Sequence, residues 1–385
     1  MRRREFVSSV GVVGGLGLAG CLTKDQTDDE AGGTDGSKTS GTGETSGSGK
    51  TTTAGEPTGT LTVGTYPSFV DSPSSSPGAW IKEQFESRYD DVTIEWKTPE
   101  NGVTEYVQRR QQGASVDIDV FVGLNIDDLV TIDGALGENR LFGKLSRDRV
   151  PHAERVRPEL SFDDPKGRVV PYDTGYISLV YDESVVDEPK TFEDLTTPAY
   201  EGTLLAQNAQ STDSGQAFML WTIDAFGEDG YLDYWKQLQD NDVKILGSWW
   251  DAYKAYLDGQ RPMVVSYSTD QVYANRDKLP MERHQIGFLN DQGYANPEGM
   301  AVVEGSDQTR LAHEFLNFML ASETQAEIAV RNVQFPAVTD EHVQLSDSFN
   351  KYAFRPPETV AFSYDELKGN LAGWTEEWAK TIASN

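Results

Sequence analysis

The chain is poor in the residues that build disulfides and most metal sites, with one cysteine and four histidines among 385 residues. A single cysteine excludes an internal disulfide and any zinc or iron–sulfur site that needs several thiolates. Basic residues are also scarce, because 33 Lys and Arg stand against 62 Asp and Glu, a formal net charge of −29. A surface this negative repels phosphate groups, so we expect no nucleic-acid partner.

Signatures of catalysis and of resident cofactors are missing as well. No G-x-S-x-G motif occurs, and no cysteine is available in the body of the chain as a nucleophile. The histidines are scattered without the spacing that binds a metal, at His152, His284, His313 and His342. We therefore expect no enzymatic activity, no metal site and no cofactor.

The acidity itself suggests adaptation to high salt. Self-repulsion destabilises a compact chain, and molar salt shortens the Debye length to about 3 Å, which removes most of that repulsion. We interpret the charge as that of a protein from a halophilic archaeon. An ordinary acidic secreted protein is the alternative interpretation.

The N-terminus combines an arginine-rich start, a short apolar stretch and the single cysteine. The run RRREF at 2–6 precedes a Val/Gly/Leu/Ala-rich stretch at 7–20, which is too short to span about 30 Å of hydrocarbon. The stretch leads through Leu-Ala-Gly to Cys21. Residues 1–21 resemble a twin-arginine signal joined to a lipobox, as in archaeal lipoproteins. The resemblance implies cleavage before Cys21, lipidation of its thiol, and a location on the extracellular face of the cell membrane through the lipid anchor only.

A low-complexity segment follows at 22–60. From Thr23 to Thr60 it contains no Val, Ile, Leu, Met or aromatic residue, only Thr, Ser, Gly, charged and a few other small or polar residues. Such a composition cannot bury enough apolar area to offset the entropy of ordering, so we predict a disordered linker. It would hold the folded body just off the membrane.

From Leu61 onward, apolar strand patterns alternate with helical ones. This alternation predicts an α/β fold in which mostly parallel sheets are flanked by helices. Strands are expected at 61–65, 92–96, 117–123, 177–181, 202–207, 243–246 and 262–267, and helices around 79–85, 103–113, 216–226, 230–238, 249–259, 270 onward, 311–320, 324–331 and after Ser363. We expect two lobes with the ligand between them: 61–175 as the first part of lobe 1, 176–290 as lobe 2, and 291–385 as the return to lobe 1 with the C-terminal helices.

Aromatic and hydroxyl side chains gather where these strands are expected to end. Tyr66 follows the first strand, Trp249 opens a helix after a Ser-x-x-Asp cap, and Tyr267 ends a strand. Rings with hydroxyls and a carboxylate between them suit a flat, cationic, hydrogen-bonding ligand. Any one of these aromatics is more often a packing residue, and only their convergence favours a site. Trp374 and Trp378 are i, i+4 neighbours, and we expect them in the core.

Several motifs in the body resemble the thiamine-binding proteins of ABC importers, in the ferric/thiamine/spermidine branch of periplasmic-type solute receptors. The matching runs are LTVGTYPSF at 61–69, NGV at 101–103, DVFVGL at 119–124, VPYD at 170–173, GY at 175–176, ST at 211–212, W-x-D-A-Y at 249–253 and VSYST at 265–269. The match covers nearly the whole body after the linker. It implies a periplasmic-binding-protein type 2 fold with two lobes and a ligand between them.

The resemblance also implies which positions contact the ligand. The family's stacking tyrosines fall on Tyr66 and Tyr273, and its tryptophan contact falls on Trp249. The remaining contacts are expected from loops and strand ends, at Asn101, Gly102, Ser211, Thr212, Asp213, Tyr267, Ser268, Thr269 and Asp270. Where the family has a tryptophan that closes over the ligand, this chain has Val333, which removes a stacking face worth about 0.5–2 kcal/mol.

The function implied is that of a monomeric, lipid-anchored receptor that binds thiamine or its phosphate and delivers it to an ABC permease with its ATPase subunits. The same receptor fold with a polyamine or ferric ion as ligand is one alternative. Ferric receptors of this branch typically carry an adjacent Tyr-Tyr pair, which this sequence lacks. A surface-tethered scaffold or hydrolase is a further alternative.

Overall fold

The computed structural model describes residues 57–72 and 76–383. The predicted signal with Cys21 and the linker up to residue 56 lie outside the described residues. The first strand begins at Gly59, slightly before the expected end of the linker, because the backbone from Gly59 pairs with the strand that starts at Val92 and needs no apolar side chain to do so. Among the helices described, none has both the length and the apolar character that a membrane span requires.

An eleven-stranded sheet forms the frame of the described chain, with the main strand order β2-β1-β3-β9-β4-β7-β5-β6. The strands are β1 Gly59–Gly64, β2 Val92–Lys97, β3 Val120–Leu124, β4 Val169–Tyr181, β5 Leu204–Gln207, β6 Lys244–Leu246, β7 Met263–Tyr267, β8 Gln285–Gly287, β9 Gln292–Val302, β10 Phe335–Pro336 and β11 Glu358–Val360.

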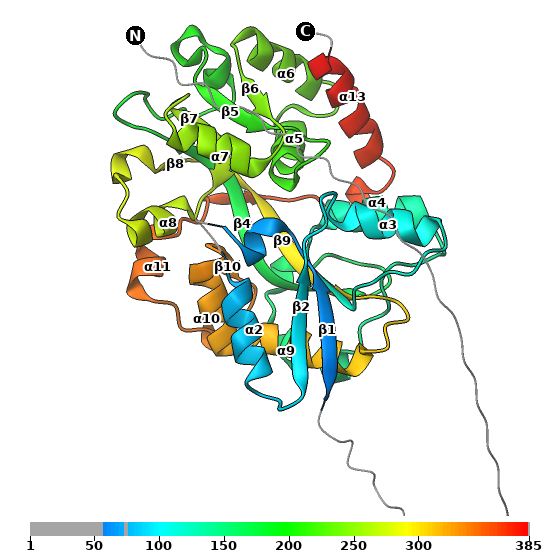
Figure 1. The fold of residues 1–385 in the computed structure, drawn as a ribbon. Coiled ribbons are helices and arrows are strands. Elements are labelled where there is room, and N and C mark those ends of the chain that lie inside the picture. The colour runs from blue at the N-terminus through cyan, green and yellow to red at the C-terminus, as the bar shows by residue number, and fades with distance from the viewer. Residues whose placement is uncertain (1–56, 73–75, 384–385) are drawn as a thin grey trace, which may run out of the picture. The chain divides into compact units, whose positions relative to one another are not determined.

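Two long strands join two parallel groups of strands. β1 pairs in parallel with β2 and β3, and β5 pairs in parallel with β6 and β7. β4 and β9 are antiparallel to each other, and they connect to β7 and β3 respectively. Figure 1 shows both long strands running between the two groups. The predicted α/β class with parallel strands in each group is confirmed, and the expected boundary between 175 and 176 falls inside β4.

Helices cover both groups of strands. They are α1 Pro67–Val70, α2 Gly78–Glu86, α3 Val103–Gln111, α4 Ile126–Leu136, α5 Asp213–Phe226, α6 Tyr231–Asp240, α7 Trp249–Leu257, α8 Asp270–Asp277, α9 Thr309–Met319, α10 Ser322–Arg331, α11 Asp347–Tyr352, α12 Tyr364–Leu367 and α13 Leu371–Ala383. The expected last helix is two helices, because the chain takes a positive φ of 90° at Gly369. Trp374 and Trp378 are buried as expected, and Trp378 meets Trp235 of α6 edge to face at 5.2 Å.

A buried cation anchors the start of β4 to the helices beside it. Arg168 has only 1% of its surface exposed, and its guanidinium donates to Asp133 of α4 at 2.6 Å and to Asp164 at 2.8 Å. The hydroxyl of Tyr364, on α12, donates to the same Asp133 carboxylate at 2.6 Å. These bonds lower the pKa of Asp133 to about 2, although burial alone would raise it.

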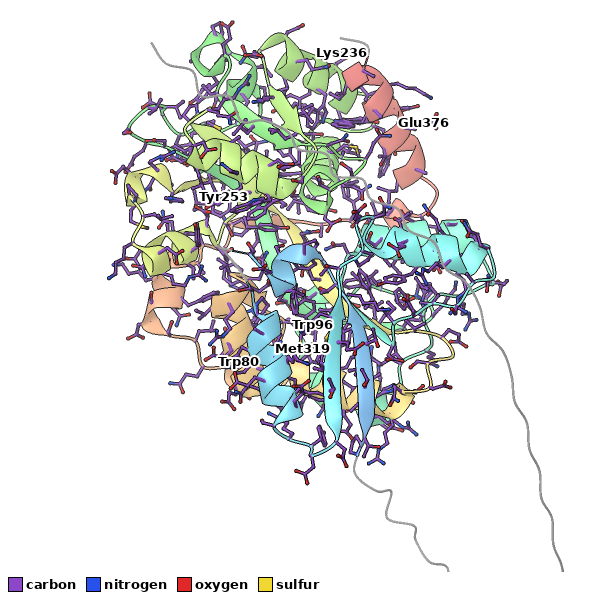
Figure 2. All side chains as sticks on the ribbon, viewed as in Figure 1. Trp80, Trp96, Lys236, Tyr253, Met319 and Glu376 are labelled. Atoms are coloured by element: carbon purple, nitrogen blue, oxygen red, sulfur yellow. The ribbon has the colours of Figure 1, made fainter. Side chains whose placement is uncertain are left out.

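Replacing this cation should cost far more than replacing a surface one. Arg168→Met leaves the buried Asp164 carboxylate without a cation and Asp133 with Lys166 alone, so we expect a loss of about 3–5 kcal/mol in the free energy of unfolding, measured by urea titration in molar KCl. Lys236→Met is the matched control, because Lys236 pairs with exposed Asp233 on the surface of α6 and should cost about 0–1 kcal/mol (Figure 2). Equal losses in the two variants would contradict the structural role of Arg168.

Candidate ligand-binding site

Two tyrosines from different strand groups lie against glycines of the sheet. Tyr66 follows β1 and has an extended backbone, as a residue before proline prefers. A Cβ added at Gly123 would lie 2.5 Å from the Tyr66 ring, and one added at Gly175 would lie 2.3 Å from the ring of Tyr267. Only glycine at these two positions lets both rings approach the backbone so closely. The sheet thereby places the Tyr66 ring, which follows β1, beside β3, and the Tyr267 ring of β7 beside β4.

A hydrogen-bonded network surrounds the hydroxyl of Tyr66. We call Tyr66, Tyr172, Asp173, Glu298 and Asn332 the tyrosine–glutamate network. Tyr66 donates to Glu298 Oε2 at 2.9 Å, and Tyr172 donates to the same oxygen. The amide of Asn332 donates to Asp173 at 2.7 Å and to the Tyr66 hydroxyl at 3.0 Å. Among the described residues, neutral donors alone therefore hold these two carboxylates, and Oδ1 of fully buried Asp173 has no partner there.

Three further carboxylates lie at the first turns of two helices. We call Asp127 and Asp128 of α4 and Asp213 of α5 the carboxylate cluster. An oxygen of each lies within 4.8 Å of the others. Asp127 is buried, Asp128 is half-buried and Asp213 is exposed. No salt bridge joins any of the three to a basic residue in the described part of the chain.

Burial and mutual repulsion shift the acidity of these groups in the same direction. Desolvation, followed by repulsion from Asp213, raises the pKa of Asp127 to about 7. Although water reaches Asp213, the protein around it removes enough solvent to raise its pKa to about 6. Desolvation also raises the pKa of Glu298 to about 7, with Asp213 adding to the shift against two tyrosine hydrogen bonds. The carboxylates of the cluster and those of the tyrosine–glutamate network are thus close enough to raise one another's pKa values.

Trp249 borders this region from α7. Its ring stacks on Tyr253, labelled in Figure 2, with centroids 4.9 Å apart and planes 11° from parallel. Its indole N–H donates to the Ser266 hydroxyl of β7 at 3.2 Å, and its ring centroid lies 6.4 Å from that of Tyr267. Ser248 caps α7 by accepting from Asp251 N–H, which places Trp249 at the first helical position as the sequence predicts. Trp249 is half-buried, so part of its surface stays available.

Four of the predicted contact residues lie close to one another, and two others form hydrogen bonds with the nearby backbone. Tyr66, Asp213, Trp249 and Tyr267 lie in or beside the region just described. The Thr212 hydroxyl caps α5 by accepting from Gly215 N–H at 3.0 Å and donates to Asn208 C=O, while the Ser211 hydroxyl donates to Gly247 C=O at 3.2 Å. The other predicted contacts form no hydrogen bond to the network or the cluster within the described residues, and they are Asn101, Gly102, Ser268, Thr269, Asp270 and Tyr273.

Residues at the junction of β7 and α8 form hydrogen bonds with other residues of the protein and not with the network or the cluster. The Asp270 carboxylate accepts from the Tyr253 hydroxyl and lies 2.6 Å from His284 Nδ1. The Ser268 hydroxyl donates to Phe354 C=O at 2.6 Å. Tyr273 is 8% exposed and packs among Tyr253 and His284. Ligand contact by these residues stays a prediction of the resemblance.

Sequence reasoning missed most of the acidic residues in this region. Asp127 and Asp128 follow a predicted strand through Asn125, and the carboxyl end of such a strand is where ligand sites form, so this signal was present. Asp173 and Glu298 were harder to find. They are paired across β4 and β9, and no local pattern announces that antiparallel register.

Val333 has an unusual backbone next to the network. Its φ is +56°, a left-handed value that β-branched residues rarely adopt and that costs of the order of 1–3 kcal/mol. Asn332 on one side is tied to Asp173 and Tyr66, and Gln334 on the other side is buried. These neighbours hold the strained residue in place.

The chain is similar to known proteins both in sequence and in fold. The family profile described as bacterial extracellular solute-binding protein matches residues 80–356. The chain is 26% identical over 326 residues to the thiamine-binding periplasmic protein of Escherichia coli, across 84% of this chain and 93% of that protein. Its fold is similar to that of a periplasmic thiamin binding protein, with a TM-score of 0.72, 25% identity and coverage of 84% and 96%. The ferric binding protein from Campylobacter jejuni is similar at a TM-score of 0.67, 18% identity and coverage of 83% and 99%.

The raised pKa values predict a pH dependence of stability. Because the folded protein holds protons on Asp213 and its neighbours up to about pH 6–7 while the unfolded chain releases them near pH 4, these groups lower the stability as the pH rises through that window. Asp213→Asn should therefore gain stability relative to the parent protein between pH 4 and 7, as measured by urea unfolding in molar KCl. Asp233→Asn, at an exposed position of α6, is the control and should show no such gain. Parallel pH profiles for the parent protein and Asp213→Asn would contradict the assignment.

Proposed function

Because the chain belongs to the family of bacterial extracellular solute-binding proteins, we propose that it is the receptor of an ABC importer and that its ligand is thiamine or its phosphate. The similarity to thiamine-binding periplasmic proteins supports this ligand. The proposed lobes are 61–175 with 291–385, and 176–290, and the ligand would lie where β4 and β9 cross between them. No bond is made or broken in this function. Hinge closure would present the loaded receptor to the permease.

One observation carries the proposal: the rings of Tyr66 and Tyr267 lie beside carboxylates that have no basic partner among the described residues. Thiamine has two flat rings, a permanent positive charge on the thiazolium and an amino group on the pyrimidine. The rings of Tyr66, Trp249 and Tyr267 suit stacking and cation–π contact, and the carboxylates suit the charge and the amino group. The side chains of this region therefore match thiamine in aromatic character and in charge.

We also propose that the receptor is a monomer tethered through a lipid on Cys21, exported by the twin-arginine route in a halophilic host. The support is the N-terminal sequence, the linker at 22–60 and the net charge of −29. Cys21→Ser should move the protein from the membrane fraction to the culture medium. Retention of this variant on the membrane would contradict a lipid anchor at that thiol.

Ferric ion is the second candidate ligand, because one feature of the structure favours it. The hydroxyls of Tyr66 and Tyr172 lie 3.5 Å apart and both donate to Glu298, so three oxygens from distant parts of the sequence converge. Iron requires the phenolate form of tyrosine, however. Burial, together with the nearby carboxylates, raises the pKa of both tyrosines well above 10 and opposes that form. Thiamine is therefore the better candidate.

Calorimetric titration in molar KCl tests the ligand. We expect thiamine to bind with micromolar affinity or tighter, about −8 kcal/mol. Trp249→Ala removes a ring beside the site and should weaken binding about tenfold, in line with about 0.5–1.5 kcal/mol for an aromatic contact. Trp80→Ala is the matched control, because Trp80 lies on α2 under Arg331, and no hydrogen bond or ring contact joins it to the network or the cluster within the described residues.

The outcomes separate the two ligands. No heat with millimolar thiamine would contradict the proposal. A visible absorption band from phenolate-to-iron charge transfer, with no thiamine binding, would establish the ferric candidate in its place. Equal weakening by the two tryptophan variants would indicate that Trp249 acts through general stability and not through the ligand.

A further inference from the structure

The N-termini of α4 and α5 are the places where this site would hold an anion. The first N–H groups of a helix have no partner in the helix, and the helix dipole adds a partial positive charge, so phosphates commonly bind there. Here the protein's own carboxylates occupy both positions. Asp127 and Asp128 lie in the first turn of α4, Asp213 lies in the first turn of α5, and their oxygens come within 4.8 Å.

Two of the hydroxyls next to these carboxylates are already engaged, whereas the buried Ser214 hydroxyl, directly after Asp213, has no partner among the described residues. Thr212 uses its hydroxyl to cap α5 and to donate to Asn208 C=O, and Ser211 donates to Gly247 C=O. Within the described residues, no Lys, Arg or His forms a salt bridge with the carboxylate cluster or with Asp173 and Glu298. A phosphate placed here would therefore face three carboxylates with no basic side chain to offset them, although the Ser214 hydroxyl could donate to it.

A second observation indicates what the site lacks. Oδ1 of Asp173 is completely buried and has no hydrogen-bond partner in the described part of the chain, and the same holds for Oε1 of buried Gln334 beside the ring of Tyr267. Buried acceptors without donors are costly, so a ligand that brings N–H groups would satisfy them. A phosphate, which mainly accepts hydrogen bonds at neutral pH, would not.

We propose that Asp213 is a specificity-determining residue that makes the site accept the unesterified organic cation and reject its phosphate esters. This inference rests on the proposed function and narrows its ligand to thiamine itself. The carboxylate cluster attracts the positive ring and repels an added phosphate. Molar salt weakens this effect little, because the oxygens concerned are only a few ångströms apart and partly desolvated. The raised pKa values of the cluster are consistent with this crowding of negative charge.

Competing titrations with thiamine and thiamine monophosphate in molar KCl at pH 8 test this inference. We expect the parent protein to prefer thiamine by at least about tenfold, since like-charge contacts oppose the ester. Asp213→Asn should reduce this preference several-fold, mainly by improving the affinity for the monophosphate. Glu376→Gln is the control of equal charge change, because Glu376 lies on the exposed face of α13 and pairs with Lys380 (Figure 2). It should leave the preference unchanged.

The possible results distinguish this inference from the proposed function. Equal affinity of the parent protein for both ligands would overturn the inference and leave the receptor function intact. An unchanged preference in folded Asp213→Asn would overturn the role of Asp213. Asp128→Asn is the second variant, and the same reduction is expected from it. Failure of thiamine to bind the parent protein at all would overturn the proposed function itself.

Discussion

Repulsion between carboxylates is the constraint on which the account of this site depends. Asp127 and Asp128 belong to α4, Asp213 to α5 and Glu298 to β9, and the fold holds them near one another with no basic residue paired to them among the residues that the structure describes. Such an arrangement is stable only if protons or a bound cation neutralise part of the charge. We therefore infer that the site suits a positively charged ligand, and that binding of this ligand is coupled to the release of protons.

Elsewhere the protein pairs its buried charges, and the contrast is informative. Arg168 holds Asp133 and Asp164 permanently, which keeps the start of β4 fixed beside α4. Glu298 receives only hydroxyl donors, from Tyr66 and Tyr172, which position the carboxylate without cancelling its charge. One ion network thus supports the frame of the sheet, while the neighbouring network keeps a negative charge available. The strained backbone at Val333 lies at the edge of the second network.

The regular parts of the fold were predictable from local patterns, and the junction between them was not. The strands around 61–65 and 262–267 were expected because apolar runs end in aromatic or hydroxyl residues, and β1 and β7 confirm them. No strand was expected at β9, although it is buried along nearly its whole length, because Asn296, Pro297 and Glu298 interrupt any apolar pattern. That strand carries Glu298 opposite Asp173. Because this pairing joins residues far apart in the sequence, these two residues of the site were not predicted. Of the predicted contacts at the β7–α8 junction, Asp270 bonds to Tyr253 and His284 inside the protein, a partnership that sequence spacing does not reveal.

Proton release on binding is the measurement that tests the central claim most directly. Titration of the protein with thiamine near pH 6.5, in molar KCl and in buffers of different ionisation enthalpy, gives the number of protons exchanged. Because the pKa of Asp213 is raised to about 6 and that of Glu298 to about 7, the free site holds protons that a cation should displace. A net release of protons is the predicted result. A binding heat that is the same in every buffer would contradict the account.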